Sequence, residues 1–486
     1  MRQHAPIPLA RGARGGAVGA ALAALALVPG TAAAATAADA PASPSLWSGA
    51  PFAGILLSIA LLPLLAPRFW ERNYPKVAAG WALLLALPLI VARGSAALGA
   101  LWHLLVVDYL PFVILLVTLF TIGGGIVVRG TLRGSPAVNA ALLATGTLLA
   151  SVIGTTGASV LLIRPLLRAN RGRRHRAHTV VFFIFLVANI GGSLTPLGDP
   201  PLFLGFLAGV PFGWTLSLWR ETLLVGGSVL AVFVVLDTRL WRREGAAARR
   251  AGAAAREPLR VGGLVNLLFL AGVVLAIAGS GAWHPGEVAL LGVRQGAQNL
   301  ARDALLLAML AASWLATPRR LREENGFTWE PMREVAILFA AIFVTMLPPL
   351  EMLRAGAHGP LAALDRAVRT PAHYFWACGL LSSFLDNAPT YLTFLASALG
   401  RLYPWLPDRE AVLRLATEHH ATLAAIATGA VFMGANTYIG NAPNFMVRAI
   451  AMEQGVRMPS FFGYMVRYSL PVLLPVFALA TWVFFR

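Results

Sequence analysis

The chain consists mainly of long apolar blocks separated by short loops that carry arginine. A helix that crosses a bilayer needs about 20 predominantly apolar residues, and block after block reaches that scale. Only 12% of the residues are charged, whereas a soluble domain carries about 25%. A β-barrel would instead need weakly alternating segments of about ten residues. The sequence therefore predicts an all-α polytopic membrane protein.

The blocks follow the same order twice. Spans are expected at 51–67, 77–92 and 101–128, then an interrupted block at 137–163, then spans at 179–207 and 222–240. The second half gives spans at 261–280, 303–317 and 335–353, an interrupted block at 374–400, and spans at 421–447 and 468–485. The sequence therefore predicts two repeats, 51–240 and 261–486. Each repeat has three helices, a hairpin and two more helices, which gives about ten spans and two hairpins in all.

Arginine predicts the sides of the membrane, because basic residues in short loops stay in the cytoplasm. Basic residues flank the block at 137–163 on both sides, with six arginines between 164 and 176. A re-entrant hairpin, which enters and leaves from the cytoplasm, keeps all of them inside. The basic linker 241–260 is then cytoplasmic, and the second half runs in the opposite direction. Inverted repeats of this kind are typical of secondary transporters.

The first 50 residues have a different character. Arg2, Arg11 and Arg14 precede an apolar run and a stretch of small residues, the pattern of a secretory signal. We expect a signal-like segment at 1–38 and an exported linker at 39–50; an uncleaved first helix is the alternative. The chain is then a multi-pass protein of a bacterial inner membrane, with both termini outside after signal removal.

The net charge of +18 would suggest nucleic acid as a partner in a soluble protein. Here the arginines lie in short loops between apolar blocks, where they set orientation and meet anionic lipid. We therefore expect the bilayer as partner and no nucleic acid. The single cysteine, Cys378, excludes an internal disulfide and a cysteine-built metal site, and we expect no cofactor.

Two short alignments support duplication. Residues 192–204 align without gaps on 434–446, with five identities, and 148–151 align on 380–383. In each alignment, the two segments occupy the same place in the order of spans of their respective halves.

Four segments place polar residues and helix breakers at membrane depth: 154–157, 193–201, 382–390 and 436–444. Unwound backbone is tolerated there only where protein buries it or where it lines a wet cavity. Glycine and proline permit the breaks; the backbone positions that we single out are Gly154, Gly157, Pro196, Gly198, Pro389, Gly440 and Pro443. Simple structural kinks are the alternative, which the pairing of the four breaks disfavours.

Asp199 and Asp386 are the most informative residues, because a charge at the centre of a membrane helix is costly and persists where it meets a pathway, a partner or an ion. A carboxylate that binds either a proton or a cation suits an exchanger. Capping of a half-helix is the structural alternative. Asp108 is a weaker candidate, and Glu221 and Asp237 lie near span ends. The predicted ion- and proton-binding set, which would hold sodium, is Asp199, Asp386, Asn387, Thr155, Thr156, Thr195, Thr437 and Asn441.

These motifs resemble those of the ion-transporter superfamily, which includes citrate and dicarboxylate carriers, arsenite pumps and NhaD-type bacterial sodium/proton antiporters. Residues 195–199 are similar to the antiporters' Ser-Pro-Ile-Gly-Asp, and 386–389 to their Asp-Asn-x-Pro; 440–444 resemble the Gly-x-x-Pro-Asn element of the superfamily. The resemblance, over roughly 50–485, implies inverted repeats, two re-entrant hairpins, scaffold and transport domains, and a homodimer.

The sequence favours exchange of sodium or lithium for protons, with no enzymatic activity. Dicarboxylate carriers typically have Ser-Asn-Thr at both tips, whereas this chain has Gly-Thr-Thr-Gly and Asp-Asn, and two aspartates would repel an anion. The alternative is a cation-coupled carrier of citrate or another carboxylate. An intramembrane aspartyl protease and a passive channel leave the paired breaks unexplained.

Overall fold

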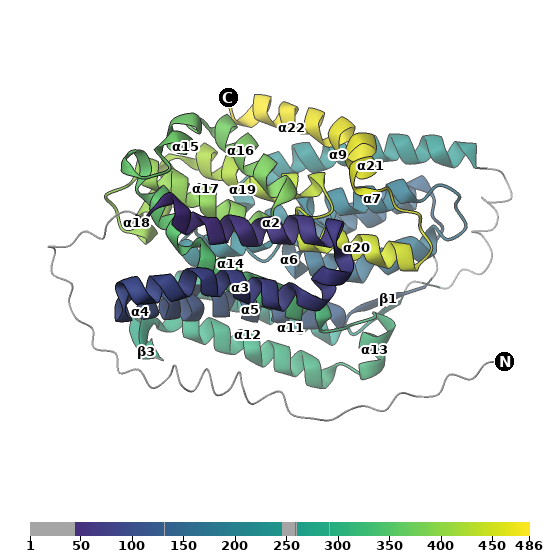
Figure 1. Ribbon diagram of the computed structural model, residues 1–486. Helices are drawn as coiled ribbons and strands as arrows, with labels where there is room; N and C mark the ends of the chain where they lie inside the picture. Colours follow the sequence, from purple (N-terminus) through teal and green to yellow (C-terminus); the bar gives the residue numbers. More distant parts are fainter. Residues whose placement is uncertain (1–43, 131, 245–257, 259, 291) are drawn as a thin grey trace.

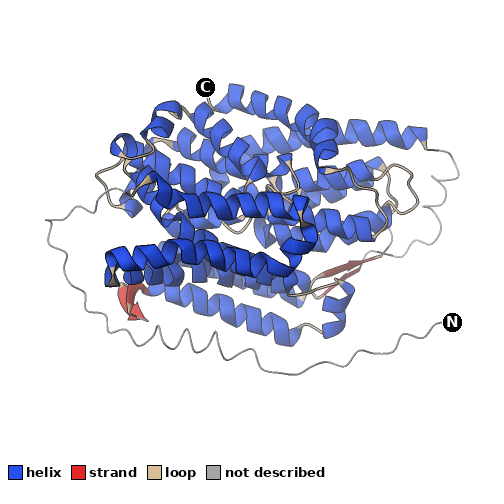
Figure 2. Cartoon of the chain, in the orientation of Figure 1, coloured by secondary structure: helices blue, strands red, loops and turns tan. Residues whose placement is uncertain are grey.

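The computed structural model describes residues 44–130, 132–244, 258, 260–290 and 292–486. These residues form a bundle of closely packed helices (Figure 1), and strands make up only two short pairs at opposite ends of it (Figure 2). Nine helices within the described ranges are long and apolar enough to cross a membrane. The all-α polytopic membrane fold predicted from the sequence is confirmed. The predicted signal-like segment lies outside the described residues.

The helices of the first half follow the predicted order. They are α2 (Ala50–Leu65), α3 (Pro67–Arg93), α4 (Ser95–His103), α5 (Leu110–Gly124), α6 (Pro136–Ala169), α7 (Ala177–Leu186), α8 (Pro200–Ala208) and α9 (Trp219–Arg243). A π-helical stretch, Leu104–Tyr109, joins α4 to α5, so that Ser95–Gly124 is one continuous span.

The second half contains α11 (Val265–Ala282), α12 (Ala297–Ala316), α13 (Arg319–Glu324), α14 (Glu330–Arg354), α15 (Ala362–Ala367), α16 (Pro371–Phe384), α17 (Asn387–Leu402), α18 (Asp408–Glu418), α19 (His420–Met433), α20 (Ala442–Glu453), α21 (Phe461–Tyr464) and α22 (Leu470–Phe484). Strand β1 (Val127–Arg129) pairs antiparallel with β2 (Arg260–Gly262), and β3 (Glu287–Leu290) with β4 (Val293–Gly296).

Helix α6 folds back on itself and forms the first hairpin. A straight helix of its 34 residues would be about 50 Å long, yet its two ends touch. The backbone N–H of Gly134 donates to the carbonyl of Ala169 at 2.9 Å, and Asn139 and Asn170 exchange side-chain hydrogen bonds of 3.0 and 2.7 Å. The reversal occurs at Gly154, where φ is 78°. Only that residue leaves the helical conformation, so the tip is tighter than the predicted 154–157.

Helices α16 and α17 form the second hairpin, joined by Leu385 and Asp386. The Arg401 guanidinium, near the end of α17, donates to the carbonyl of Val368, just before α16 begins, at 2.9 Å. The rings of Tyr374 and Phe394 lie 6.4 Å apart across the pair. Both interrupted blocks therefore return to the end of the bundle from which they start.

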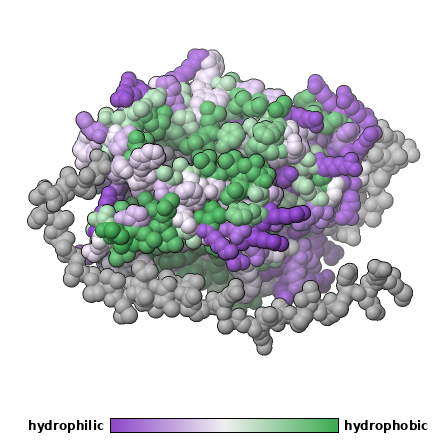
Figure 3. Space-filling view, in the orientation of Figure 1, coloured by the Kyte–Doolittle hydropathy of each residue, from purple (hydrophilic) through white to green (hydrophobic). Residues whose placement is uncertain are grey.

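Segments predicted to share a side of the membrane do contact one another. At the end of the bundle that carries β1 and α13, Arg129 pairs with Glu324 at 2.8 Å, and Arg168 donates to the carbonyl of Val128. Hydrophilic side chains gather at this end in the space-filling view, and apolar ones cover much of the middle (Figure 3). We call it the basic end. At the opposite end, Trp214 donates to the carbonyl of Ala416 at 3.1 Å.

One predicted loop is helical. The basic residues at 68–76 were expected to lie between two spans, but they form the first turns of α3, which starts at Pro67 directly after a break at Ala66. Proline is well suited to the first position of a helix because its missing N–H has no partner there. The chain therefore bends at a single residue. The first span also begins earlier than predicted, at Leu46 instead of at residue 51.

The hairpin turn at Gly154 gives a direct test. Gly154→Ala forces a side chain into a positive-φ conformation, which costs about 1–3 kcal/mol, and should lower the thermal midpoint of the purified protein in detergent. Gly157→Ala is the matched control, since its new Cβ would meet only Ile153, at an ordinary 3.7 Å. Equal midpoints for the two variants would show that the reversal does not depend on glycine.

Candidate functional site

The four interrupted segments meet at the carboxylate of Asp199. The Thr155 hydroxyl, on the first hairpin, donates to Oδ1 at 2.8 Å, and the Asn441 amide donates to the same oxygen at 3.1 Å. The Asn387 amide, on the second hairpin, donates to Oδ2. Asp199 itself is 2% exposed. One buried carboxylate thus receives a donor from each of the other three segments.

Unwound backbone positions Asp199. Helix α7 ends at Leu186 and α8 starts at Pro200, so a stretch of 13 residues separates them, with one turn of 3-10 helix at Ile190–Ser193. The N–H of Thr155 donates to the carbonyl of Gly198 at 2.8 Å and fixes the hairpin tip against this stretch. Gly198 packs so closely on Gly192 that a Cβ at Gly198 would collide with the Gly192 backbone. Glycine is required there by close approach.

The second half repeats this local geometry. Helices α19 and α20 are separated by residues 434–441, and a Cβ at Gly440 would lie 2.6 Å from the carbonyl oxygen of Gly434. Asn441, which aligns with Asp199, has φ −154° and ψ 138°, against −148° and 145° for Asp199. The two aligned residues are hydrogen-bonded to each other.

Two threonines clamp the breaks to the hairpins in the same way. The Thr195 hydroxyl donates to the carbonyl of Ser151, and the Thr437 hydroxyl to that of Ser383. Each hydroxyl also accepts an N–H two residues later, from Leu197 at 3.1 Å and from Ile439 at 3.2 Å. These contacts match the sequence alignment position by position, and the duplication itself stays a prediction.

Asp386 differs from Asp199 in its surroundings. Its side chain is half-buried and accepts from the N–H of Ala388 at 3.0 Å, which caps the start of α17. Asp199 occupies the corresponding position at the start of α8 but makes no side-chain cap bond. The capping interpretation therefore applies to Asp386. The two carboxylates lie close enough to interact electrostatically, and Asn387, which follows Asp386 in the chain, donates to Asp199.

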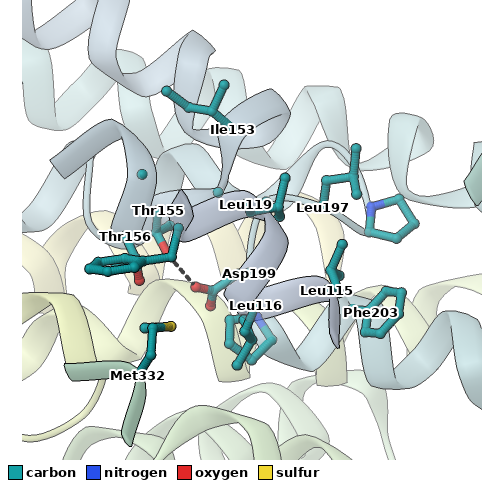
Figure 4. A pocket seen from close by; sticks show the side chains of 16 residues that line it. Leu115, Leu116, Leu119, Ile153, Thr155, Thr156, Leu197, Asp199, Phe203 and Met332 are labelled. Atoms are coloured by element: carbon teal, nitrogen blue, oxygen red, sulfur yellow. Dashed lines mark hydrogen bonds between the residues drawn. The ribbon is translucent and has the colours of Figure 1, made fainter. Parts of the chain in front are cut away.

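A cavity of about 30 Å³ adjoins Asp199. In Figure 4, Thr155 and Asp199 point toward one another, with Thr156 beside them and Met332 of α14 below. Leu115, Leu116 and Leu119 of α5 line another side. One water-sized body needs about 10–15 Å³ by this measure, so the cavity has room for two or three water molecules or for a small ion.

Two buried amide oxygens at the site, the Oδ1 atoms of Asn189 and Asn387, lack a partner among the described residues. The amide of Asn387 is completely buried and donates through its nitrogen to Asp199, while its Oδ1 accepts no hydrogen bond. A buried polar atom of this kind costs about 1–3 kcal/mol, and a bound cation would satisfy it. Carboxylate, hydroxyl and amide oxygens are suitable ligands for a hard cation.

The predicted site residues fall into three groups. Thr155, Asn387 and Asn441 bond directly to Asp199, and half-buried Thr156 lines the cavity. Thr195 and Thr437 instead bind hairpin carbonyls, so their coordination of an ion stays a prediction. Of the predicted helix-break positions, the cavity is lined by Gly154, Gly157, Pro196 and Gly198, whereas Pro389, Gly440 and Pro443 lie outside the lining.

Sequence reasoning missed Asn189 and Asn444. Asn189 donates to Asn444 Oδ1 at 2.7 Å and joins the two breaks directly; both residues are completely buried. Asn444 lay within a predicted break, while Asn189 preceded one by four residues. Asp237, taken from the sequence as an unremarkable residue near a span end, is also completely buried, and it pairs with Arg173 at 2.6 Å and His178 at 2.7 Å. This cluster lies at the base of the first hairpin, where the Asn139 amide donates to Asp237 at 3.0 Å, and no contact found among the described residues joins it to Asp199.

A comparison with protein families gives one match. The model of a family described as "Putative citrate transport" matches residues 41–485, nearly the whole chain, and the chain belongs to that family. No curated protein matches it significantly. The family supports a transporter, and its description agrees better with the carboxylate alternative than with the favoured sodium/proton exchange.

The donors around Asp199 give a second prediction. Thr155→Val removes one hydrogen bond to a buried carboxylate, worth about 1.5–3 kcal/mol, and should lower the thermal midpoint of the purified protein. Thr156→Val is the control, because no hydrogen bond of the neighbouring Thr156 hydroxyl is found among the described residues. If the two valine variants unfold together, the Thr155 contact contributes nothing.

Proposed function

We propose that this member of the citrate-type family is a cation-coupled transporter of citrate or another small carboxylate. Family membership supports the substrate class. The observation that carries the coupling is the buried Asp199 carboxylate, held by donors from three other interrupted segments beside an ion-sized cavity. Such a group exchanges its partners when a proton or a cation arrives.

The coupling cation binds at Asp199 on the side of the cavity, which Thr155 and Thr156 also line. Asn387 lies outside that lining and contacts the carboxylate through its amide nitrogen. Thr155 currently donates to the carboxylate; rotation of its hydroxyl turns the oxygen lone pairs toward a cation instead. Protonation of Asp199 competes with the cation for the same oxygens. Asp386, half-buried and nearby, is a second group that can take up a proton. The sodium, lithium or proton that drives transport is cargo of this site.

The carboxylate substrate binds at the helix starts. The return arm of α6 begins at Thr155, α8 at Pro200, α17 at Asn387 and α20 at Ala442, and the residues just before or within these starts meet around Asp199. Helix N-termini carry partial positive charge, which favours an anion. The anion binds once a cation has neutralised Asp199, which removes the repulsion between two negative groups that the sequence suggested.

Entry of such a substrate requires movement, because 30 Å³ is too small for a tricarboxylate. The cavity lies between the first hairpin and the apolar faces of α5 and α14. An apolar boundary makes few directional bonds that must break when one side slides past the other. We propose that α5 and α14 belong to a scaffold, and that the hairpins and breaks move against it within two inverted repeats and a homodimer.

Sodium or lithium exchange for protons is the second candidate. It is favoured by the size of the cavity, which accommodates an ion without any opening, and by two interacting acids, Asp199 and Asp386. In this mechanism the same oxygens bind a proton and a cation in turn, and no carboxylate is moved.

Uptake in proteoliposomes tests both candidates. The purified chain is reconstituted, a sodium or proton gradient is imposed, and uptake of radiolabelled citrate is measured along with internal pH. Gradient-stimulated citrate uptake is the expected result. Asp199→Asn removes a charge-assisted site worth about 1.5–3 kcal/mol and should reduce uptake roughly 10- to 100-fold. Asp408→Asn is the control, since its exposed carboxylate pairs with Arg354 far from the site.

The outcomes separate the two candidates. Sodium-dependent pH change without citrate uptake would favour the exchanger. Undiminished pH change in both Asp199→Asn and Asp386→Asn would refute exchange through these acids, and undiminished citrate uptake in Asp199→Asn would refute coupling through this carboxylate.

A further inference from the structure

A small apolar cluster lies between the cavity beside Asp199 and the basic end of the bundle. It consists of three buried side chains: Phe120 of α5, Val160 of α6 and Met332 of α14. They are 6%, 8% and 7% exposed, and they form a group separate from the main hydrophobic core. Phe120 and Met332 also line the cavity, and Met332 lies below Thr156 in Figure 4. We call these three residues the basic-end cluster.

The course of the three helices places this cluster on the basic side of the cavity. Helix α5 runs toward the basic end, where β1 follows it, and Phe120 lies in its last two turns. Val160 lies one turn beyond Thr156 on the return arm of α6, which leads to the arginines at 164–176. Met332 is in the first turn of α14, shortly after α13. A path from the cavity to the basic end along these helices therefore passes through the cluster.

Little protein covers the basic-end cluster from outside. Among its apolar neighbours, Phe327, Val335 of α14 and Met446 of α20 are only partly buried. The ring of Phe327 stacks on Phe120, with 5.0 Å between the centroids. Phe445, next to Met446, is 43% exposed. The cluster is therefore a single buried layer with partly exposed side chains behind it.

The opposite side of the cavity is closed by the main core. Phe203 of α8 and Leu115 of α5 line the cavity there, at 1% and 2% exposure. One turn further along α5, Phe112 is completely buried and stacks on Phe339 of α14 at 4.7 Å. Phe203 aligns with Phe445 of the second half, which is 43% exposed. Opening the cavity on this side would expose more apolar surface than opening it toward the basic end.

We propose that the basic-end cluster is a gate and, taking Asp199 as the proposed coupling site, that the coupling ion reaches Asp199 from the basic end. Hydrophobic constrictions close membrane pathways by excluding water. Apolar contacts are not directional, so the gate opens without breaking hydrogen bonds. Met332 suits this role, because its unbranched and flexible side chain adapts to different surroundings.

Thiol labelling from each face of the membrane tests the gate. Cys378, the buried single cysteine, is replaced by alanine, and Thr156→Cys then reports on access to the cavity. In the same background, Arg319→Cys, at an exposed position of α13, marks the face to which the basic end points. A membrane-impermeant methanethiosulfonate reagent is applied to right-side-out and to inverted vesicles. It should label Thr156→Cys faster from the face that Arg319→Cys marks.

Substitutions of Met332 should change this labelling rate in both directions. Met332→Ala should speed labelling about tenfold, because less apolar surface must be exposed to open the gate. Met332→Trp fills the gate and should slow labelling by a similar factor. Met352→Ala is the matched control, since it removes the same side chain, 2% exposed, near the other end of α14, and it should leave the rate unchanged. Thermal midpoints of the purified variants show whether each is folded.

The gate would be overturned by faster labelling of Thr156→Cys from the face opposite to that of Arg319→Cys. Equal rates for Met332→Ala and Met352→Ala, or an unchanged rate in a folded Met332→Trp, would also overturn it. The labelling needs neither a gradient nor a substrate. A failure of citrate uptake and of ion exchange, with the expected labelling intact, would therefore refute the proposed function alone.

Discussion

The fold depends on one requirement: a carboxylate held at membrane depth must be satisfied by donors from the protein. Asp199 obtains these donors from Thr155, Asn387 and Asn441. They come from segments far apart in the chain, so the hydrogen bonds also determine how the hairpins and breaks pack. An unpaired charge there would be costly, and this cost favours the arrangement in which all four segments converge. The Asp199 carboxylate, which we propose for coupling transport to a cation, thus also makes some of the main contacts between the four segments.

The sequence located the breaks well because the residues that make them are conspicuous. Glycine, proline and asparagine in otherwise apolar spans allow few structures, and the contacts of Thr195 and Thr437 match the aligned serines. The hairpin in α6 followed from arginine on both flanks. The extent of unwinding was less predictable: Thr155 and Thr156 are in a helix, since a single glycine with positive φ is enough to reverse the chain.

Other features depend on contacts that no local pattern contains. The hydrogen bond from Asn387 to Asp199 joins residues of the two halves. The Oδ1 atom of Asn387 could be identified as unpartnered only after the structure showed that its amide nitrogen donates to Asp199. Asp237 looked peripheral because it lies near a helix end, but Arg173 and His178 close over it. The residues at 68–76 looked like a loop because they are polar, although a helix at the edge of the bilayer accepts such residues on its outer face.

The unequal pair formed by Asp199 and Asn441 has a consequence for the charge at the site. The two residues occupy equivalent places with nearly the same backbone angles, but only one of them can carry charge. A symmetric pair of aspartates would bring two negative groups into contact and would require two positive charges for balance. With an amide on one side, a single monovalent ion neutralises the pair. Two aligned positions with the same backbone shape thus differ in the charge that they can carry.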